Sequence, residues 1–322
     1  MDNPKILIID KVHTYLQQTL AAEGYKCITN TDISLKELKE TIGQYTGLVV
    51  RSRFKIDKKL IDGGSRLKFI ARLGSGMENI ETDYAASREI ICLNSPEGNR
   101  DSVGEHATGI LLALLNKVLI SDQQVRHGIW KRLENMGTEI MGKTIGIIGY
   151  GNTGSAFARC LKGFDANVIA YDKYKKDFSN EFVKEVSMEE IFRQTDILSL
   201  HIPLTDETRY LVNEDYVARF SKNIFLVNTS RGEVVLTRDL VTLLKNGKIS
   251  GAALDVLEYE KYSFEKLELD KFPGDFQYLI NSDRVVLTPH IAGITKESIF
   301  KLAKVLTDKI LKHFPISRKE HR

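Results

Sequence analysis

Residues 144–154 read TIGIIGYGNTG, and this stretch decides the fold. An apolar run typical of a buried β-strand, 144–148, leads into Gly149, Gly151 and Gly154, and the residues that follow have helical spacing. A strand, the pattern G-x-G-x-x-G and a helix in direct succession are the context that a dinucleotide-binding fold requires. The first glycine permits a tight turn, the second lets the backbone approach a pyrophosphate, and the third lets helix and strand pack closely. The N–H groups that begin the helix then face the phosphates.

A carboxylate at the end of the next strand indicates which dinucleotide binds. Asp172 follows the apolar run 167–171, eighteen residues after Gly154, where an acid can accept hydrogen bonds from both ribose hydroxyls of an adenosine. The same carboxylate repels a 2′-phosphate, so we predict NAD rather than NADP as the cofactor. Lysines at 173, 175 and 176 follow immediately and weaken this preference. The alternative, a plain glycine turn beside a solvated aspartate, is disfavoured because strand, glycines, helix and acid agree.

Short β-rich apolar runs alternate with helical periodicity on both sides of the glycine pattern. This alternation is typical of βαβ units and predicts an α/β fold with two parallel sheets. The predicted strands are 5–9, 47–50, 68–71, 90–93, 144–148, 167–171, 197–200, 224–227, 252–254 and 285–287. The predicted helices are 15–22, a long one from about 101 to 119, 153–161, 239–244 and a final one from 295 to about 314. We expect Asp101 and Ser102 to cap the long helix.

The composition excludes several classes of protein. Among 322 residues, 46 Lys and Arg stand against 43 Asp and Glu, and a net charge of +3 is too small for a polybasic nucleic-acid binder. With 42% hydrophobic and 28% charged residues, the chain has the composition of a globular protein. The longest apolar run, 107–115, is far shorter than the ~20 residues that span a bilayer, and no secretory signal opens the chain. We therefore expect a cytoplasmic protein without a membrane partner.

The cysteines do not suggest a disulfide framework or a thiolate metal site. Cys27, Cys92 and Cys160 are far apart and lack C-x-x-C spacing, which fits a reducing compartment. We interpret each as a small buried hydrophobic residue. The histidines and acids also lack ligand spacing, so no metal is expected.

Three later segments place polar side chains just past a predicted strand: Arg231 in NTSRG, Asp255 and Glu260 in DVLEYE, and His290 in TPH. Because open parallel sheets bind ligands at the carboxyl ends of their strands, one cleft could collect all of them. A histidine can move a proton on a hydroxyl oxygen, a carboxylate partner orients its ring, and an arginine fork binds a carboxylate. This set fits hydride transfer between a nicotinamide and a 2-hydroxy acid. Each residue also has a purely structural alternative. Arg231 could form a surface ion pair, Glu260 could be a solvated acid in a loop, and His290 could be a core histidine whose ring nitrogens are hydrogen-bonded.

At these residues the sequence resembles the D-isomer-specific 2-hydroxyacid dehydrogenases, over nearly the whole chain. The matching motifs are RLGSG at 72–76, NSP at 94–96, the glycine pattern, NTSRG at 228–232, GAALDV at 251–256 and TPH at 288–290. The resemblance implies that Arg231 clamps the substrate, that His290 is the acid/base group and that Glu260 is its partner. The NAD contacts that it implies are Asn152, Thr153, Thr229 and Asp255. The backbone N–H groups of Ser75 and Gly76 would hold the substrate carboxylate.

The resemblance also implies a domain organisation. A Rossmann NAD-binding domain, residues 101–291, would be inserted in a flavodoxin-like substrate-binding domain made of 1–100 and 292–322. The helix from Asp101 usually forms a dimer arm in this family, so a homodimer is expected. His201, at another strand end, we interpret as structural or adjacent to the cofactor.

Within the family, the sequence is most similar to the D-3-phosphoglycerate dehydrogenases. Residues 50–53, VRSR, match the segment that meets the substrate phosphate there, and Arg51 and Arg53 could form a dianion site. The resemblance thus implies conversion of D-3-phosphoglycerate to 3-phosphohydroxypyruvate, a step of serine biosynthesis. The alternative for the two arginines is that their charges merely flank an exposed strand end.

Some residues depart from the phosphoglycerate pattern and leave other substrates open. Lys261 stands where many relatives have proline, the stretch 261–283 is long, and Glu78 stands where aspartate is usual. A chain that ends at 322 is expected to lack the serine-sensing domain of some relatives. The alternatives are a D-lactate, glyoxylate or hydroxypyruvate reductase of the same family, or a non-catalytic NAD-sensing protein similar to the corepressors that share this fold.

Overall fold

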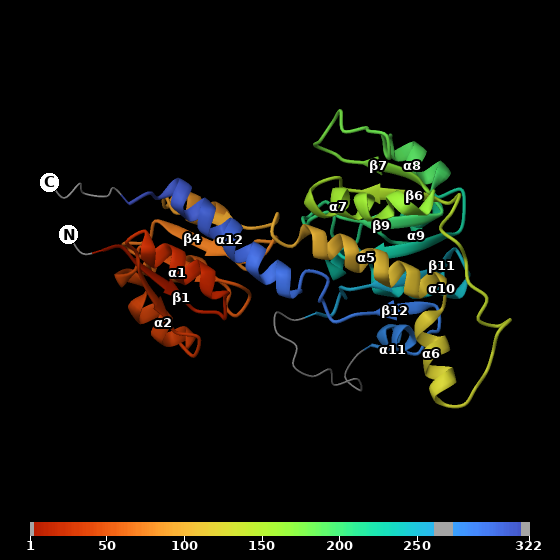
Figure 1. Ribbon diagram of the computed structural model, residues 1–322, viewed down its shortest axis with the longest axis horizontal. Helices are drawn as coiled ribbons and strands as arrows, with labels where there is room; N and C mark the ends of the chain where they lie inside the picture. Colours follow the sequence, from red (N-terminus) through yellow and green to blue (C-terminus); the bar gives the residue numbers. More distant parts are fainter. Residues whose placement is uncertain (1–2, 261–272, 317–322) are drawn as a thin grey trace. The chain divides into compact units, whose positions relative to one another are not determined.

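The protein has an α/β fold, as the sequence predicts (Figure 1). The computed structural model describes residues 3–260 and 273–316. In these residues the strands form two sheets, and every pairing between neighbouring strands is parallel. The chain divides into two compact units: Met1–Asn99 with Ile294–Arg322, and Arg100–Gly293.

The first unit contains a five-stranded sheet with helices on both faces (Figure 1). In sheet order its strands are β2 (Lys26–Thr29), β1 (Lys5–Ile8), β3 (Gly47–Val50), β4 (Phe69–Arg72) and β5 (Ile91–Asn94). Its helices are α1 (Thr14–Ala22), α2 (Leu35–Thr41), α3 (Lys58–Gly63), α4 (Thr82–Ser87) and α12 (Lys296–His313). The strand order is the flavodoxin-like one.

Both faces of this sheet are buried, which explains its continuous apolar strands. Successive side chains point to opposite faces of a strand, so Ile6 and Ile8 pack with α1 and α12, whereas Leu7 packs with α2 and α3. The helix α12 begins with a capping box between Thr295 and Ser298 and returns the end of the chain to this unit.

The second unit contains a seven-stranded sheet. In sheet order its strands are β12 (Val285–Leu287), β11 (Ile249–Leu254), β10 (Ile224–Asn228), β9 (Ile197–Leu200), β6 (Thr144–Ile148), β7 (Asn167–Tyr171) and β8 (Val183–Glu185). The order reverses between β6 and β9, and this switch point is where such sheets bind ligands. The edge strands β2 and β8 are absent from our predictions because their polar residues, KCIT and VKE, interrupt any apolar run.

Helices cover both faces of the second sheet. On one face lie α5 (Arg100–Leu115) and α7 (Asn152–Cys160), side by side in Figure 1. On the other face lie α8 (Met188–Gln194), α9 (Glu214–Ala218), α10 (Thr237–Lys245) and α11 (Gly274–Ile280). Several of these helices have only five to seven residues, too few for a periodic pattern to reveal them.

The predicted long helix over 101–119 is wrong, because the chain forms two helices. After α5 the chain breaks at Lys117, whose φ of 51° is left-handed, and α6 continues over Val118–Arg126. Apolar spacing runs through the break, so periodicity could not show it. The predicted cap is also wrong: α5 begins at Arg100, and Asp101 lies in its first turn, where its carboxylate binds Arg159 at 2.9 Å.

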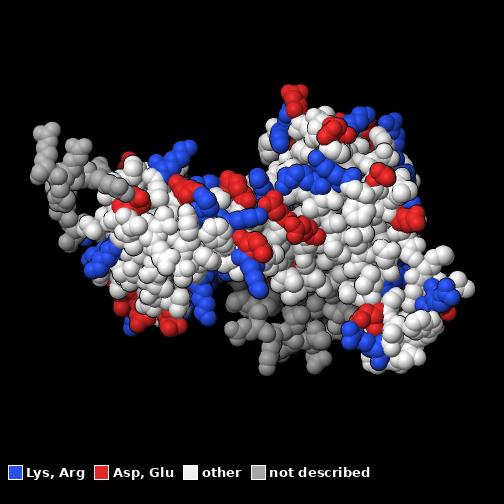
Figure 2. All heavy atoms as spheres, in the orientation of Figure 1, with Lys and Arg blue, Asp and Glu red and all other residues white. Residues whose placement is uncertain are grey.

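No single helix in the described ranges is long and apolar enough to cross a membrane. The pair α5 and α6 meets the length and composition criteria together, with a bend of 61° between the two helices. On the face shown in Figure 2, basic and acidic side chains are intermixed over both units.

Candidate active site

The glycine turn connects β6 to α7 at the switch point. Gly149 has a φ of 90°, and a Cβ there would lie 2.4 Å from the main-chain oxygen of His201. A Cβ at Gly154 would lie 2.0 Å from the main-chain oxygen of Gly149, so both positions require glycine. Gly151 differs, because no atom of the described chain outside the turn itself lies within 4 Å of a Cβ built there. Its backbone faces open space just before α7, where a phosphate can approach the helix N-terminus.

Asp172 ties the glycine turn to the loop after β7. Its Oδ2 accepts a hydrogen bond from the Tyr150 N–H at 2.7 Å, and its Oδ1 accepts from the N–H groups of Tyr174 and Lys175, both at 2.9 Å. Burial raises the pKa of this carboxyl, but the three hydrogen bonds and the charge of Lys175 outweigh burial and hold the pKa below its usual value. The ionised carboxylate keeps acceptor capacity for a ribose hydroxyl.

The three lysines after Asp172 all have partners other than a ligand. Lys173 forms an ion pair with Glu207, and the Lys176 ammonium donates to the main-chain oxygen of Asp172 at 3.0 Å. The Lys175 ammonium lies over an aromatic ring, 5.0 Å from its centroid. Only Lys173 of the three is paired with a carboxylate, and the other two ammonium groups contact a main-chain oxygen and an aromatic ring. Our preference for NAD therefore rests on Asp172.

His201 supports the glycine turn from the end of β9. Its Nδ1 lies 3.2 Å from Thr153 Oγ1 and its Nε2 lies 2.9 Å from Ser199 Oγ. Complete burial lowers the pKa of His201 to about 3, so the ring is neutral over the physiological range. Thr153 lies at the start of α7 beside Asn152, and His201 fixes the orientation of its hydroxyl.

The loop after β10 is shaped by a buried amide. Asn228 accepts hydrogen bonds from the Ser230 N–H at 3.0 Å and hydroxyl at 2.7 Å, and it donates to the Arg231 main-chain oxygen at 2.9 Å. Between them, the buried Thr229 Oγ1 has no hydrogen-bond partner among the described residues. A buried hydroxyl without a partner is unfavourable. This orphan atom, the open backbone at Gly151 and the ionised Asp172 fit a dinucleotide along one edge of the sheet.

The structure brings Glu260 and His290 together. The distance between Glu260 Oε2 and His290 Nδ1 is 2.6 Å, and the histidine side chain is half-exposed. The other carboxylate oxygen of Glu260 accepts from the Leu257 N–H, which fixes the acid on its own turn. The pairing uses Nδ1, so Nε2 is the ring nitrogen available to a substrate.

Close backbone packing joins the loop that carries Arg231 to the turn that carries Glu260. A Cβ at Gly232 would lie 2.0 Å from the carbonyl of Leu257, so the chain at 232 runs directly against the turn that carries Glu260. The Arg231 guanidinium donates to the Ser230 main-chain oxygen at 2.6 Å. Arginine, acid and histidine therefore follow three neighbouring strands, β10, β11 and β12, at their carboxyl ends.

Asp255 lies beneath the turn that carries His290. It is 1% exposed, and its carboxylate accepts from the N–H groups of Ile291 and Ala292, both at 2.9 Å, and from the Thr288 hydroxyl at 2.6 Å. Burial raises its pKa, but these hydrogen bonds outweigh burial and lower it overall. Its predicted contact with NAD stays a prediction, since the structure shows it as a support of the turn.

In the first unit, the loop 74–76 after β4 presents backbone donors. The Arg72 guanidinium donates to the Gly76 main-chain oxygen, and Asn94 donates to that of Ser75 at 2.7 Å. The Ser75 hydroxyl donates to Asn99 at 2.8 Å. The N–H groups of Ser75 and Gly76 donate to no other described residue, as a pair of carboxylate donors requires.

The two arginines of the predicted phosphate site have different surroundings. The Arg53 guanidinium donates to the main-chain oxygens of Ile9 and Thr31 and lies 4.8 Å from the centroid of the Phe54 ring. No hydrogen bond or ion pair joins the Arg51 guanidinium to another described residue. Arg51 is thus the better placed of the two to bind a ligand.

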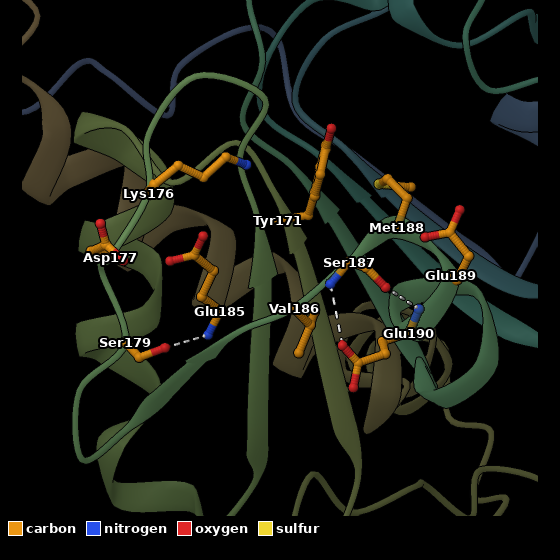
Figure 3. A pocket seen from close by; sticks show the side chains of 10 residues that line it. All are labelled: Tyr171, Lys176, Asp177, Ser179, Glu185, Val186, Ser187, Met188, Glu189 and Glu190. Atoms are coloured by element: carbon orange, nitrogen blue, oxygen red, sulfur yellow. Dashed lines mark hydrogen bonds between the residues drawn. The ribbon is translucent and has the colours of Figure 1, made fainter.

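A surface hollow of about 770 Å³ lies beyond the ends of β7 and β8 (Figure 3). None of the predicted site residues lines it. Four acidic residues line it: Asp177, Glu185, Glu189 and Glu190. The Glu190 side chain forms a capping box with Ser187 at the start of α8. An acidic lining repels phosphate groups, so this hollow does not serve the phosphate end of a dinucleotide.

The reversed parallel sheet, the glycine turn and the acid on the adjacent strand together define a dinucleotide-binding domain. Residues 108–292 match the family described as D-isomer specific 2-hydroxyacid dehydrogenase, NAD binding domain. The chain belongs to this family, and the matched residues lie within its second unit.

The relatives carry several substrate names. The chain is 32% identical over 309 residues to a D-3-phosphoglycerate dehydrogenase of Archaeoglobus fulgidus, covering 95% of this chain and 56% of that protein. It is 34% identical over 289 residues to a hydroxypyruvate reductase of Thermotoga maritima, covering 90% and 91%. It also resembles a solved structure of Aquifex aeolicus D-lactate dehydrogenase with NAD and lactic acid, with a TM-score of 0.80, 26% identity and coverage of 96% and 95%. The chain thus spans about half the length of the phosphoglycerate relative but nearly all of the reductase.

Proposed function

We propose that this protein is an NAD-dependent oxidoreductase that interconverts a D-2-hydroxy acid and its 2-keto acid. The observation that carries the proposal is the Glu260–His290 pair at 2.6 Å, on a turn packed against Gly232 beside Arg231. The same edge of the sheet holds the glycine turn, and the family of the chain supports this reaction class.

The reaction moves a hydride and a proton. In reduction, the carbonyl carbon of the 2-keto acid gains a hydride and its oxygen gains a proton, which gives the 2-hydroxy acid. NAD, when bound in its reduced form, supplies the hydride. His290 holds the proton on Nε2 and delivers it to the carbonyl oxygen, because Nδ1 is held by Glu260. The Glu260 carboxylate orients the ring through its contact with Nδ1.

In this proposal, two sets of hydrogen-bond donors bind the substrate. Arg231 offers a planar, permanently charged fork to the substrate. The N–H groups of Ser75 and Gly76 bind its carboxylate. Cofactor binding falls to the turn Gly149–Gly154, with Asp172 on the adenosine ribose and Thr229 offering its unpartnered hydroxyl.

An absorbance assay at the NADH band tests the activity. The purified protein should oxidise NADH in the presence of a 2-keto acid and should yield the D-hydroxy acid, identified by chiral chromatography. Binding of NADH without turnover on any 2-keto acid would contradict the proposal and favour an NAD-sensing protein.

The substrate that we propose is D-3-phosphoglycerate, supported by the motif VRSR, the open Arg51 side chain and the phosphoglycerate relative. The test compares 3-phosphohydroxypyruvate, hydroxypyruvate, glyoxylate and pyruvate on wild type and Arg51→Ala. A guanidinium that binds the phosphate should lower kcat/KM for the phosphorylated acid about ten- to a hundredfold and leave the other acids unchanged. An equal loss on all four acids, or a preference of the wild type for an unphosphorylated acid, would contradict it.

We also infer a homodimer. The helix α6 and the segment after it expose large apolar side chains: Leu119 53%, Val125 52%, Trp130 76%, Leu133 83% and Met136 72%. Exposed apolar surface of this kind marks interaction sites. Light scattering should give twice the monomer mass for the wild type and the monomer mass for a Trp130→Glu, Leu133→Glu variant.

A further inference from the structure

We propose that His106 is a positioning residue that holds the His290 turn in place through Thr288 and Asp255. This inference rests on the proposed function, because it assigns His106 to the same acid/base step. His106 lies in α5, far in the sequence from the other three residues, and none of the motifs discussed above includes it.

The contacts of His106 converge on the base of the turn. Its Nε2 lies 3.0 Å from Thr288 Oγ1 and 3.3 Å from Asp255 Oδ1. The helix α5 packs on the sheet through buried neighbours of His106, including Ala107, Ile110 and Leu111, in the same apolar cluster as Ala253 of β11 and Val286 of β12. The imidazole is therefore held on a rigid element next to the ends of both strands.

The direction of each hydrogen bond follows from the chemistry of the groups. An ionised Asp255 only accepts, so the Thr288 hydroxyl must donate its single proton to Oδ1, at 2.6 Å. The Thr288 oxygen can then only accept from His106, which makes Nε2–H the donor. The chain of donation runs from His106 to Thr288 to Asp255, and the same Nε2 also lies 3.3 Å from Asp255 Oδ1.

This chain ends on a strained turn. His290 has a φ of 55°, a left-handed conformation that a non-glycine residue adopts at a cost in free energy. The N–H of His290 donates to the Asp255 main-chain oxygen at 2.8 Å, and the next two N–H groups donate to the Asp255 carboxylate. Asp255 thus imposes the turn, and His106 contacts Oδ1, the carboxylate oxygen that also accepts from Thr288 and Ile291.

Loss of the His106 donor should therefore act on the proton step rather than on cofactor binding. A small displacement of a catalytic group can lower a rate about a hundredfold. We expect His106→Leu to lower kcat for 2-keto acid reduction about ten- to a hundredfold, and the Kd of NADH, from a fluorescence titration, to change less than about twofold. His106→Gln, whose amide can donate from the position of Nε2, should recover most of kcat.

Matched variants separate positioning from general damage. Glu105→Leu, at the exposed neighbouring position of α5, should leave kcat and stability at wild-type values. Thr288→Val should reproduce the loss of His106→Leu, and the double variant should lose no more than either single variant, because both break one chain of donation. Additive losses, failure of Gln to rescue, or an equal loss of NADH affinity would overturn the proposal.

Amide hydrogen exchange gives a readout that does not depend on turnover. In His106→Leu, the peptide that contains Ile291 and Ala292 should exchange faster than in the wild type, whereas in Glu105→Leu it should not. If the wild type reduces no 2-keto acid, the proposed function fails, and this exchange measurement still decides whether His106 holds the turn. Unchanged exchange in His106→Leu would overturn the positioning role.

Discussion

The region that we propose to bind the cofactor and the region that we propose to transfer the proton are built in different ways. Around β6 and β7 the geometry is set by backbone: Gly149 and Gly154 leave no room for a Cβ, and Asp172 binds three N–H groups. Around β11 and β12 the geometry is set by side chains that meet from distant parts of the sequence, at 106, 255, 260, 288 and 290. Substitutions in the first region should therefore act on folding and cofactor affinity, and those in the second should act on turnover.

The strongest expected effect lies in the second region. His290→Ala removes the proton donor that we propose and should lower kcat by a factor of roughly 10² to 10⁴, the usual contribution of a positioned acid or base. The Kd of NADH should stay near the wild-type value, which a fluorescence titration measures. Unchanged kcat across the pH range would refute the proposed role of His290 as proton donor. It would also contradict the expectation that substitutions in the second region act on turnover.

The glycine turn allows a sharper test within the first region. Gly154→Ala puts a Cβ 2.0 Å from a main-chain oxygen, and we expect it to lower the free energy of unfolding by about 1–3 kcal/mol, as overpacking does. Gly151→Ala meets open space, so its unfolding free energy should change by less than about 0.5 kcal/mol while its affinity for NADH falls. Denaturant titrations and NADH titrations of both variants provide the measurement. Equal destabilisation by the two substitutions would contradict this division of roles.

Asp172 is the side chain on which cofactor choice depends. Asp172→Asn removes a charged acceptor worth about 1.5–3 kcal/mol, so the Kd of NADH should rise about ten- to a hundredfold. The affinity for NADPH should change less, because the repulsion of a 2′-phosphate disappears at the same time. Titration with both cofactors measures the ratio, and an unchanged ratio would exclude Asp172 from the ribose site.

The smallest effect concerns stability in acid. Burial lowers the pKa of His201 to about 3, whereas in the unfolded chain the pKa returns to its usual value of 6.5. Between these two values only the unfolded chain binds the extra proton. The contribution of His201 to the free energy of unfolding is thus fully present above about pH 6.5. It is lost as the pH falls toward 3, at up to about 1.4 kcal/mol per pH unit. His201→Gln should reduce the difference in unfolding free energy between pH 7 and pH 5 by about 2 kcal/mol. Thr153→Val keeps the imidazole and should keep most of that difference.

The same contrast explains what could be predicted from the sequence. The α/β class, most central strands and the glycine turn follow from local patterns, since buried parallel strands are continuous apolar runs and the turn needs glycines at fixed spacing. The edge strands β2 and β8 and the break at Lys117 do not follow, because edge strands carry polar residues and the apolar spacing continues through the break. These features are decided by tertiary packing.

In the candidate site, the sequence indicates residue types at strand ends but not their contacts. Arg231, Glu260 and His290 are singled out by position, yet the support of the His290 turn by His106 and Thr288 joins residues that no spacing rule connects. The different surroundings of Arg51 and Arg53 are likewise invisible in the motif VRSR, because main-chain oxygens of other loops engage Arg53.

Gly232 has a consequence for how this protein can change. Because its backbone touches that of Leu257, any side chain at 232 would push the guanidinium-bearing loop away from the turn that carries Glu260. The distance between the loop that carries Arg231 and the turn that carries Glu260 is therefore set by a main-chain contact, and substitutions of surface side chains do not change it. We therefore expect substitutions at 232 to be tolerated less well than substitutions at Arg51, whose guanidinium has no hydrogen bond or ion pair to another described residue.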